Sequence, residues 1–299
     1  MVDKPEGMTS HDVVSIARRT LKQTRIGHTG TLDPFATGVL PLACGRATRL
    51  VRFMASASKT YEATIRFGLV TDTYDITGTA VMQTDTRPSA EAVRAEIESL
   101  SRERMQEPPP YSAKKVAGKR AYELARKNLP VTLEPVPVHV SQVDVLDLTP
   151  DRAVVRLTCS AGFFVRSFAH DLGSRLGAGA CLETLRRTRS GHFDLDQAVT
   201  LAGLQAGEGP DAMLGLDRLL PDFAEVVVNV TGRERLGHGQ TIRPGDISRH
   251  SAVGVRPGPG SPGGAADQWV RISDDAGTLV GVGTWDGPDA TLRPNIVLI

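Results

Sequence analysis

Asp33 is the carboxylate whose surroundings best suit catalysis. It lies in the string GHTGTLDPFATGVL at residues 27–40, and no other Asp or Glu occurs between Asp12 and Glu62. The other charged side chains of that stretch are cationic, and a carboxylate among cations stays ionised and can act as a nucleophile or a base. Pro34 fixes its own φ and favours extended backbone at Asp33. The alternative interpretation of Asp33 is an Asx-turn or a helix cap before the proline.

Regular patterns on both sides of this string predict the elements that position it. Apolar residues at helical spacing predict helices at 9–23, 90–100 and 163–176. A Thr9–Asp12 capping pair marks the start of the first of these helices. Alternating or β-rich segments predict strands at 61–67, 138–148 and 152–159. We expect residues 27–45 to form a structured loop that leads into an apolar stretch, and the order of elements predicts an α+β domain.

The last quarter of the chain has a different pattern. Short apolar segments from about residue 223 onward predict a small β-rich domain, and the Gly- and Pro-interrupted residues 204–222 connect it to the first domain. The string PGPGSPGG at 257–264 has no apolar side chain to pack, so we expect a disordered loop at about 250–267.

The net charge of +1 conceals three basic segments. Residues 1–60 hold nine Lys or Arg against four Asp or Glu, residues 101–130 hold eight against three, and residues 152–193 hold seven against two. Such segments are typical of a face that binds a polyanion, although solvated surface charge explains them equally well. In the second segment aromatic residues alternate with basic ones, a composition that suits contact with RNA.

Several classes of protein are disfavoured by the sequence. No apolar run reaches the roughly 18 residues of a membrane helix, and the N-terminal residues lack the apolar core of a signal peptide, so we expect a cytoplasmic protein with no membrane partner. Three scattered cysteines without a CxxC pair predict neither a disulfide framework nor a zinc site. The chain has no phosphate-binding loop and no dinucleotide fingerprint.

The sequence resembles the bacterial tRNA pseudouridine synthases of the TruB family over nearly its whole length. Besides the string at 27–40, four blocks agree in order: VDKPEGMTSHDVV at 2–14, KTYEATIRFGLVTDTYDITG at 59–78, PPPYSAKKVAGKRAYELAR at 108–126 and CSAGFFVRSFAHDLG at 159–173. The resemblance implies an α+β fold: a catalytic domain at 1–220 with a mixed, largely antiparallel sheet, an RNA-contacting insertion at about 105–130, and a PUA-like RNA-binding domain at 223–299. It also implies a monomeric isomerase that converts the uridine at position 55 in the T-arm of tRNA to pseudouridine, with no metal, no cofactor and no ATP.

The resemblance also assigns site residues. Asp33 becomes the essential carboxylate, which either adds to the base or attacks the sugar. Tyr61 stacks on the uracil, and Arg166 pairs with Asp33. His28 helps to displace the target base, and Asp75 holds Arg166 from the other side. Further RNA or substrate contacts are implied for Lys4, Tyr111, Lys114, Lys115, Lys119 and Leu185.

Taken without the resemblance, three of these residues have plainer interpretations. Tyr61 is then a core aromatic, Arg166 a surface arginine on an amphipathic helix, and His28 a loop residue. The sequence also departs from the family at Phe164, where a tyrosine is frequent, so a hydroxyl hydrogen bond from that position is absent. At the N-terminus, either residues are missing upstream or the first strand is short.

Two other functions stay open on the sequence. One is a tRNA-binding or tRNA-folding module in which catalysis is secondary. The other is the synthase subunit of a guide-RNA-dependent complex, which the compact chain and the lack of basic tails disfavour.

Overall fold

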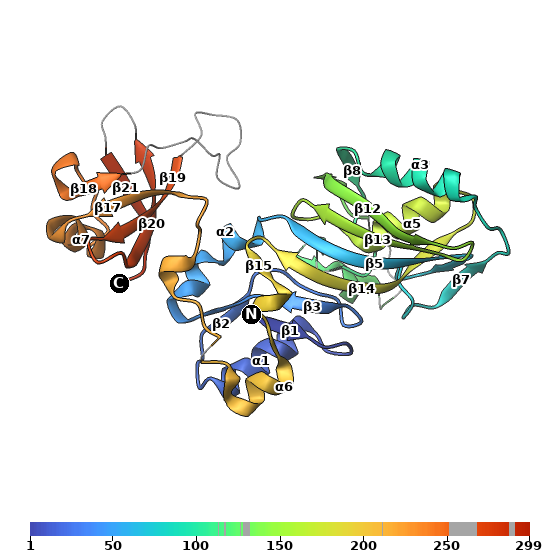
Figure 1. Ribbon diagram of the computed structural model, residues 1–299, viewed down its shortest axis with the longest axis horizontal. Helices are drawn as coiled ribbons and strands as arrows, with labels where there is room; N and C mark the ends of the chain where they lie inside the picture. Colours follow the sequence, from blue (N-terminus) through green and yellow to red (C-terminus); the bar gives the residue numbers. More distant parts are fainter. Residues whose placement is uncertain are drawn as a thin grey trace. The chain divides into compact units, whose positions relative to one another are not determined.

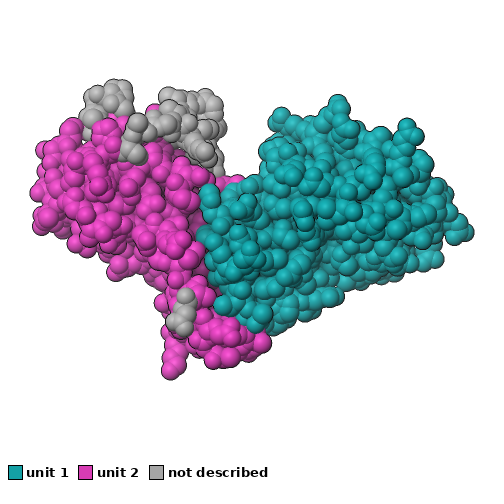
Figure 2. Space-filling model, in the orientation of Figure 1, with its two compact units in different colours: residues 1–13, 31–41, 57–201 teal, residues 14–30, 42–56, 202–299 magenta. Residues whose placement is uncertain are grey.

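The computed structural model describes residues 1–112, 114–116, 118–125, 127, 132–210, 212–250, 268–286 and 291–299. These residues form two compact units, drawn in different colours in Figure 2. Unit 1 comprises residues 1–13, 31–41 and 57–201, and unit 2 comprises residues 14–30, 42–56 and 202–299. The string at 27–40 is therefore shared between the units, and Asp33 belongs to unit 1. The predicted boundaries of a catalytic domain at 1–220 and a PUA-like domain at 223–299 stay a prediction.

A mixed sheet of eight strands forms the centre of unit 1 in the described part of the chain (Figure 1). Its order is β12-β13-β5-β14-β3-β1-β16, and β15 pairs with β14. The β14–β3 and β1–β16 pairs are parallel and the others are antiparallel, as predicted. The strands are β1 (Val2–Lys4), β3 (Thr37–Leu40), β5 (Lys59–Phe67), β12 (Val140–Leu148), β13 (Arg152–Cys159), β14 (Ala180–Ser190), β15 (Phe193–Asp194) and β16 (Val199–Thr200).

Helices α3 (Ala90–Leu100) and α5 (Val165–Arg175) cover one face of this sheet (Figure 1). Their apolar residues share one core with the alternate residues of β5, and this alternation is the pattern that predicted the strand. The opposite face is polar: Arg156 contacts Glu62 at 2.7 Å, and Arg152 contacts Glu183 at 2.6 Å. The sheet therefore has one buried face, against which α5 is placed.

Smaller elements complete unit 1. Two pairs of short strands, β6–β7 and β8–β11, and the β9–β10 pair with α4 lie outside the central sheet. Their bounds are β6 (Leu69–Thr71), β7 (Ala80–Gln83), β8 (Arg104–Gln106), β9 (Lys115–Val116), β10 (Lys119–Arg120), α4 (Ala121–Ala125), β11 (Val136–Val138) and η2 (Leu195–Gln197).

Unit 2 contains a five-stranded sheet of order β18-β17-β19-β20-β21 with its own apolar core, which confirms the predicted β-rich C-terminal region. Its elements are β17 (Ala224–Val228), α7 (Val230–Gly237), η5 (Pro244–Asp246), β18 (Ile247–His250), β19 (Gln268–Asp274), β20 (Leu279–Asp286) and β21 (Thr291–Val297). All but the first residue of the loop expected at 250–267 lies outside the described residues.

The rest of unit 2 precedes that sheet. Its elements are β2 (Ile26–His28), β4 (Leu42–Cys44), η1 (Gly45–Leu50), α2 (Val51–Ala55), α6 (Leu201–Gly203), η3 (Leu204–Glu208) and η4 (Leu216–Arg218). Helix α1 (Ser10–Thr20) begins in unit 1, and the predicted capping pair is present, because Thr9 and Asp12 each accept the other's backbone N–H. The prediction of a loop at 27–45 was incomplete, because β3 and β4 occupy much of it and meet at Pro41, which has no N–H to donate to a sheet.

Gly38 tests how tightly the string at 27–40 is packed. Its φ is +106°, and a Cβ atom there would lie 2.1 Å from the backbone oxygen of Arg187 on β14. We expect Gly38→Ala to lower the free energy of unfolding by more than about 3 kcal/mol, because both the backbone and the neighbouring strand would have to move. Gly27→Ala is the matched control, since nothing lies within 4 Å of the place that its Cβ atom would take. Urea titration of both variants measures the difference, and equal stabilities would contradict this prediction.

Candidate active site

Asp33 and Arg166, which lie 133 residues apart in the sequence, meet as a bidentate ion pair. Arg166 Nε lies 2.9 Å from Asp33 Oδ2, and Arg166 Nη2 donates to Asp33 Oδ1 at 3.1 Å. Two contacts of this kind fix the orientation of the carboxylate. The Arg166 side chain is 6% exposed, whereas the Asp33 side chain is 34% exposed. Asp33 is therefore held from the protein side and stays accessible from solvent.

Hydrogen bonds from the residues after β1 hold the backbone on both sides of Asp33. The buried hydroxyl of Ser10 donates to Leu32 O at 3.1 Å and accepts from Leu32 N at 2.8 Å. Gly7 N donates to Pro34 O at 2.8 Å. The loop that carries Asp33 is thus clamped one residue before and one residue after the carboxylate.

Lys4 supports the same loop. Its side chain is fully buried, and its ammonium donates to the carbonyl oxygens of Pro5 at 2.8 Å, Met8 at 2.7 Å and Pro34 at 3.1 Å. Desolvation lowers the pKa of Lys4 to about 8, an effect that Asp33 opposes, so the ammonium predominates at neutral pH. We predicted an RNA or substrate contact for Lys4, whereas the structure places all three of its donors on backbone carbonyls.

Arg166 has three further acceptors, from two other segments. Its Nη1 donates to Thr73 O at 3.1 Å and lies 3.5 Å from Asp75 Oδ2, and its Nη2 donates to Tyr111 O at 2.9 Å. A buried guanidinium needs such partners, because each unpaired N–H would lose its hydration without compensation. The loop of Asp33, the turn at 73–75 and the segment around Tyr111 therefore converge on one cation.

Asp75 is itself fixed by the turn that contains it. Its Oδ1 accepts hydrogen bonds from Thr73 Oγ1 at 2.9 Å, Thr77 Oγ1 at 2.6 Å and Thr77 N at 3.0 Å, and the residue is 4% exposed. This leaves Oδ2 to face Arg166. The sequence singled out Asp75 but not the threonines, although the spacing in TDTYDIT is that of an Asx-type turn.

Gln106 was missed by the sequence analysis. It is fully buried, and its amide donates to Phe164 O at 3.0 Å and accepts from Phe164 N at 2.8 Å. Phe164 is the N-cap residue of α5, so this amide holds the start of the helix two residues before Arg166. One turn on, Ser167 Oγ donates to Glu107 O at 2.7 Å. A single Gln before a proline run has no sequence signal that could have revealed this role.

Tyr61 lies on β5 in the same buried cluster as Leu32 and Phe35, which flank Asp33. Burial raises the pKa of its hydroxyl, and a hydrogen bond with the buried Arg187 opposes that rise, so the phenol is neutral at neutral pH. Arg187 in turn donates to Val39 O at 2.8 Å. The structure thus brings Tyr61, Asp33, Arg166 and Asp75 together in unit 1, and their catalytic roles stay predictions.

The other predicted contact residues are spread over several elements. Tyr111 donates its hydroxyl to Asp72 at 3.4 Å, and Leu185 is buried in the cluster that contains Tyr61. His28 is half-buried at the end of β2 in unit 2, and Lys114 is exposed. Lys115 and Lys119 belong to the β9–β10 pair, and their side chains lie outside the described structure.

The third basic segment, at 152–193, does not form an open cationic face. Arg166 and Arg187 are buried, and four other arginines of the segment contact carboxylates at 2.6–3.4 Å, namely Arg152, Arg156, Arg175 and Arg186. Six of the seven arginines of the segment are therefore buried or paired with a carboxylate, and Arg189 is exposed.

The electrostatic environment of Asp33 combines opposing effects. Desolvation raises the pKa of its carboxyl above the ordinary 3.8, Arg166 acts against this rise, and Asp75 adds to it. Because a third of the side chain is exposed and the arginine contact is bidentate, we expect the rise to be limited and the carboxylate to be ionised at neutral pH.

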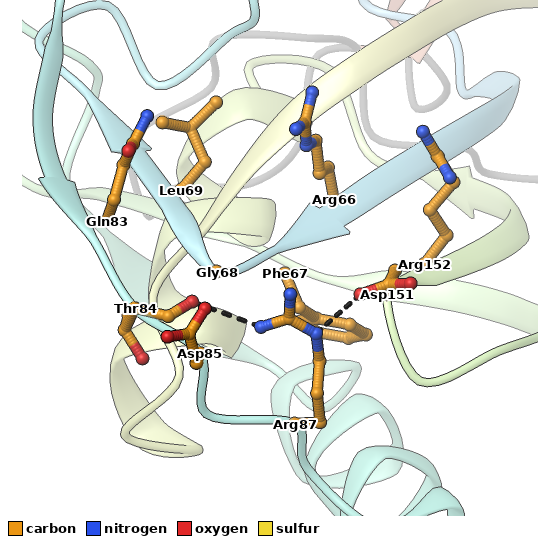
Figure 3. Close-up of a pocket in the computed structure, with 10 residues that line it drawn as sticks. All are labelled: Arg66, Phe67, Gly68, Leu69, Gln83, Thr84, Asp85, Arg87, Asp151 and Arg152. Atoms are coloured by element: carbon orange, nitrogen blue, oxygen red, sulfur yellow. Dashed lines mark hydrogen bonds and ion pairs between the residues drawn. The ribbon is translucent and has the colours of Figure 1, made fainter.

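A pocket on unit 1 lies at the end of β5 that is remote from Tyr61 (Figure 3). Its volume is about 490 Å³ and its lining includes Arg66, Arg87 and Arg152. Arg66 is five residues from Tyr61 along the strand, a separation of about 17 Å. Arg87 is bonded to Asp151, and the other two arginines contact Glu183. Each arginine of this pocket therefore has a carboxylate partner in the lining or beside it, and the pocket is separate from the Asp33 site.

Two further properties concern the described residues as a set. Within them, no group of three or more His, Cys, Asp or Glu side chains is placed to hold a metal ion. None of the described helices has the length and apolar character needed to cross a membrane.

Comparison with known proteins identifies the family of this chain. Residues 18–165 match the family model of the N-terminal domain of TruB family pseudouridylate synthases, and residues 166–221 match that of the tRNA pseudouridylate synthase B C-terminal domain. The tRNA pseudouridine synthase B of Solibacter usitatus (strain Ellin6076) is 44% identical over 290 residues, which are 95% of this chain and 94% of that protein. The enzyme of that name from Geobacter sulfurreducens is 39% identical over 86% of both chains.

The fold is also found among solved structures. The crystal structure of the archaeal box H/ACA sRNP Nop10–Cbf5 complex contains a chain that matches with a TM-score of 0.74 at 23% identity, over 100% of this chain and 85% of that one. The two family models and these relatives define a pseudouridine synthase, and the solved structure shares its fold. Within this class, the chain belongs to the TruB family of pseudouridylate synthases. The predicted family, fold class and isomerase activity are thereby confirmed.

Lys4→Met tests the support of the Asp33 loop. Loss of the ammonium takes a donor from the carbonyl oxygens of Pro5, Met8 and Pro34, of which Pro34 O keeps its bond from Gly7 N. We therefore expect the free energy of unfolding to fall by about 2–4 kcal/mol. Lys22→Met, at an exposed lysine, should change it by less than about 0.5 kcal/mol. Thermal and urea unfolding of both variants make the comparison, and a Lys4→Met protein as stable as the control would show that these hydrogen bonds do not hold the loop.

The pH dependence of activity tests the state of Asp33. Only the ionised carboxylate can act as nucleophile or base, so activity is full above the raised pKa and is lost as the pH falls through it. We expect the acidic limb of kcat/KM to lie above pH 3.8, and Arg166→Lys to move it to higher pH, since Arg166 lowers the pKa of Asp33. Rates measured from pH 4 to 8 for both proteins decide this, and coincident acidic limbs would show that the bidentate contact of Arg166 does not control the pKa of Asp33.

Proposed function

We propose that this protein converts the uridine at position 55 in the T-arm of tRNA to pseudouridine, acting as a monomer in the cytoplasm, with Asp33 as the catalytic carboxylate. The observation that carries the proposal is the accessible, bidentately held Asp33 in a chain so similar to proteins named tRNA pseudouridine synthase B. A tRNA substrate is consistent with a cytoplasmic site of action.

The reaction breaks the N1–C1′ bond of uridine and forms a C5–C1′ bond, while the proton on C5 leaves to solvent and N1 acquires one. No electrons are gained or lost overall, so the chemistry requires a positioned anionic oxygen rather than a redox group. Asp33 has the accessibility for attack on either the base or the sugar, and the Arg166 fork limits its rotation. Holding this oxygen beside the glycosidic carbon supplies much of the rate through effective molarity.

The other site residues have roles that follow from their positions. A neutral Tyr61 beside Asp33 offers a flat ring for the uracil and a hydroxyl for proton transfer. The target base must leave its loop before reaction. We assign to His28 the role of stacking in the place that the base has left. We assign to the segment containing Tyr111 and Lys114 the role of contacting the RNA. The backbone carbonyl of Tyr111 also accepts a hydrogen bond from Arg166, so a segment that contacts the RNA would also contact the Asp33–Arg166 pair.

Tritium release from 5-³H-uridine-labelled, unmodified tRNA tests the proposal, with mapping of the modified position. Wild type should release tritium from a single T-loop uridine. Asp33→Asn should release none, and should bind tRNA within about tenfold of wild type because affinity depends mainly on phosphate contacts. Asp85→Asn, which changes an exposed carboxylate of the same unit, is the matched control and should behave as wild type.

Other outcomes would separate the rival functions. Tight tRNA binding by wild type without tritium release would indicate an RNA-folding module. Release only when a guide RNA or protein subunit is added would indicate a guide-dependent synthase. Loss of tRNA binding in Asp33→Asn by more than about a hundredfold would show that Asp33 is structural.

A further inference from the structure

Tyr74 has a strained backbone and lies between two residues that contact Arg166. It lies between Thr73, whose carbonyl accepts from Arg166, and Asp75, whose carboxylate faces the same guanidinium. Its φ is +64°, in the left-handed region that a bulky side chain rarely adopts. Such a conformation persists only where the surrounding structure stabilises it, and it recurs at functional sites.

The ring of Tyr74 is stacked on the ring of His170. The two centroids are 3.8 Å apart and the planes are inclined by 8°. His170 lies on α5 four residues after Arg166, so both side chains leave the same face of the helix. The stack therefore joins the turn at 73–75 directly to the helix that carries the arginine.

The backbone of the turn is tied on its other side to β14. Leu182 N donates to Tyr74 O at 3.0 Å, and Ile76 N donates to Leu182 O at 2.9 Å. These bonds fix the turn against the sheet but do not connect it to α5. Besides the contacts of Arg166, the Tyr74–His170 stack joins the turn to the helix.

His170 contributes a flat ring more than a polar group. Its Nδ1 is buried and has no hydrogen-bond partner among the described residues. Burial also lowers the pKa of His170 and raises that of Tyr74, so both rings are neutral at neutral pH. Two neutral, nearly parallel rings in contact interact through packing. A phenylalanine at position 170 should therefore preserve the contact with Tyr74.

We propose that the Tyr74–His170 stack positions the catalytic arginine. It holds the strained turn at a fixed distance from α5, so that Thr73 O and Asp75 meet Arg166 Nη1 while the Nε and Nη2 edge of the fork stays aligned with Asp33. Neither ring is assigned a contact with the substrate. The inference rests on the proposed function, because it concerns the geometry of a pair whose catalytic role is itself proposed.

His170→Leu and His170→Phe form the central test, since both keep an apolar side chain on α5 and only Phe keeps a flat ring. Tyr74→Ala and Tyr74→Gly separate loss of the ring from relief of the strained φ, because glycine adopts φ near +60° without cost. His139→Ala, at an exposed histidine of the same unit, is the matched control. For each protein, kcat and KM are measured by tritium release, together with tRNA affinity, the acidic limb of kcat/KM and Tm.

We expect His170→Leu, Tyr74→Ala and Tyr74→Gly to lower kcat at least about tenfold, because small displacements of a catalytic group cost that much. Their tRNA affinity should stay within about threefold, and their acidic limb should move to higher pH as Arg166 loses alignment with Asp33. His170→Phe should recover most of the lost rate. The Tyr74→Ala, His170→Leu double variant should lose no more than about threefold beyond either single variant, since both changes remove the same contact.

Three results would overturn the proposal. In the first, His170→Leu keeps the wild-type kcat. In the second, kcat and Tm fall together while the acidic limb stays in place, which would make the stack merely structural. In the third, Tyr74→Gly is as active as wild type, which would show that the ring of Tyr74 is not needed to position Arg166. Failure of the proposed function is distinguishable, because wild type itself would then release no tritium from tRNA.

Discussion

The buried guanidinium of Arg166 is the group on which the arrangement of the site depends. A cation that is almost wholly removed from water is tolerated only if its charge is matched and its N–H groups find acceptors. Two carboxylates and two backbone carbonyls provide this match, and they come from three segments that are far apart in the sequence. Folding therefore brings these segments together around α5 as a condition of burying the arginine.

The two carboxylates that contact Arg166 differ in their exposure to solvent. Asp75 is buried, and one of its oxygens is saturated by two threonines, so it serves as a fixed counter-charge. Asp33 has accessible surface, and its carboxylate is held chiefly by the arginine. Arg166 is shared by both carboxylates, and Asp33 is the one of the two that solvent can reach.

The loop that carries Asp33 is held by hydrogen bonds to the residues on both sides of it. The residues after β1 bind the loop at Leu32 and Pro34, and Lys4 adds a charged anchor to the second of these points. The backbone around the carboxylate is thus fixed through its neighbours rather than through the carboxylate itself. Its oxygens are left to Arg166 on one side and to the substrate on the other.

Elements with a regular period were predictable from local pattern. The alternation in β5 and the helical stripes of α3 and α5 follow from one buried face, so the sequence identified them within a few residues. Strand β14 escaped prediction, although it pairs with β5 along its whole length, because two irregularities in register, at Leu182/Thr184 and Arg187/Arg189, interrupt its alternation. Polar positions that serve a distant backbone, such as Gln106 and Lys4, likewise carried no local signal of their role.

The sequence by itself determined the family, the chemistry and the identity of the central carboxylate, because a long ordered set of motifs constrains these more strongly than any single residue type. Only the tertiary structure decided which basic residues are free and which are internal, and which side chains hold Asp33 in place. The physical reason is that charge and residue type are local properties, whereas burial and hydrogen-bond partners depend on contacts between segments distant in the chain. Lys4 illustrates the difference: the family resemblance implied an RNA or substrate contact, and its three carbonyl partners became visible only in the folded chain.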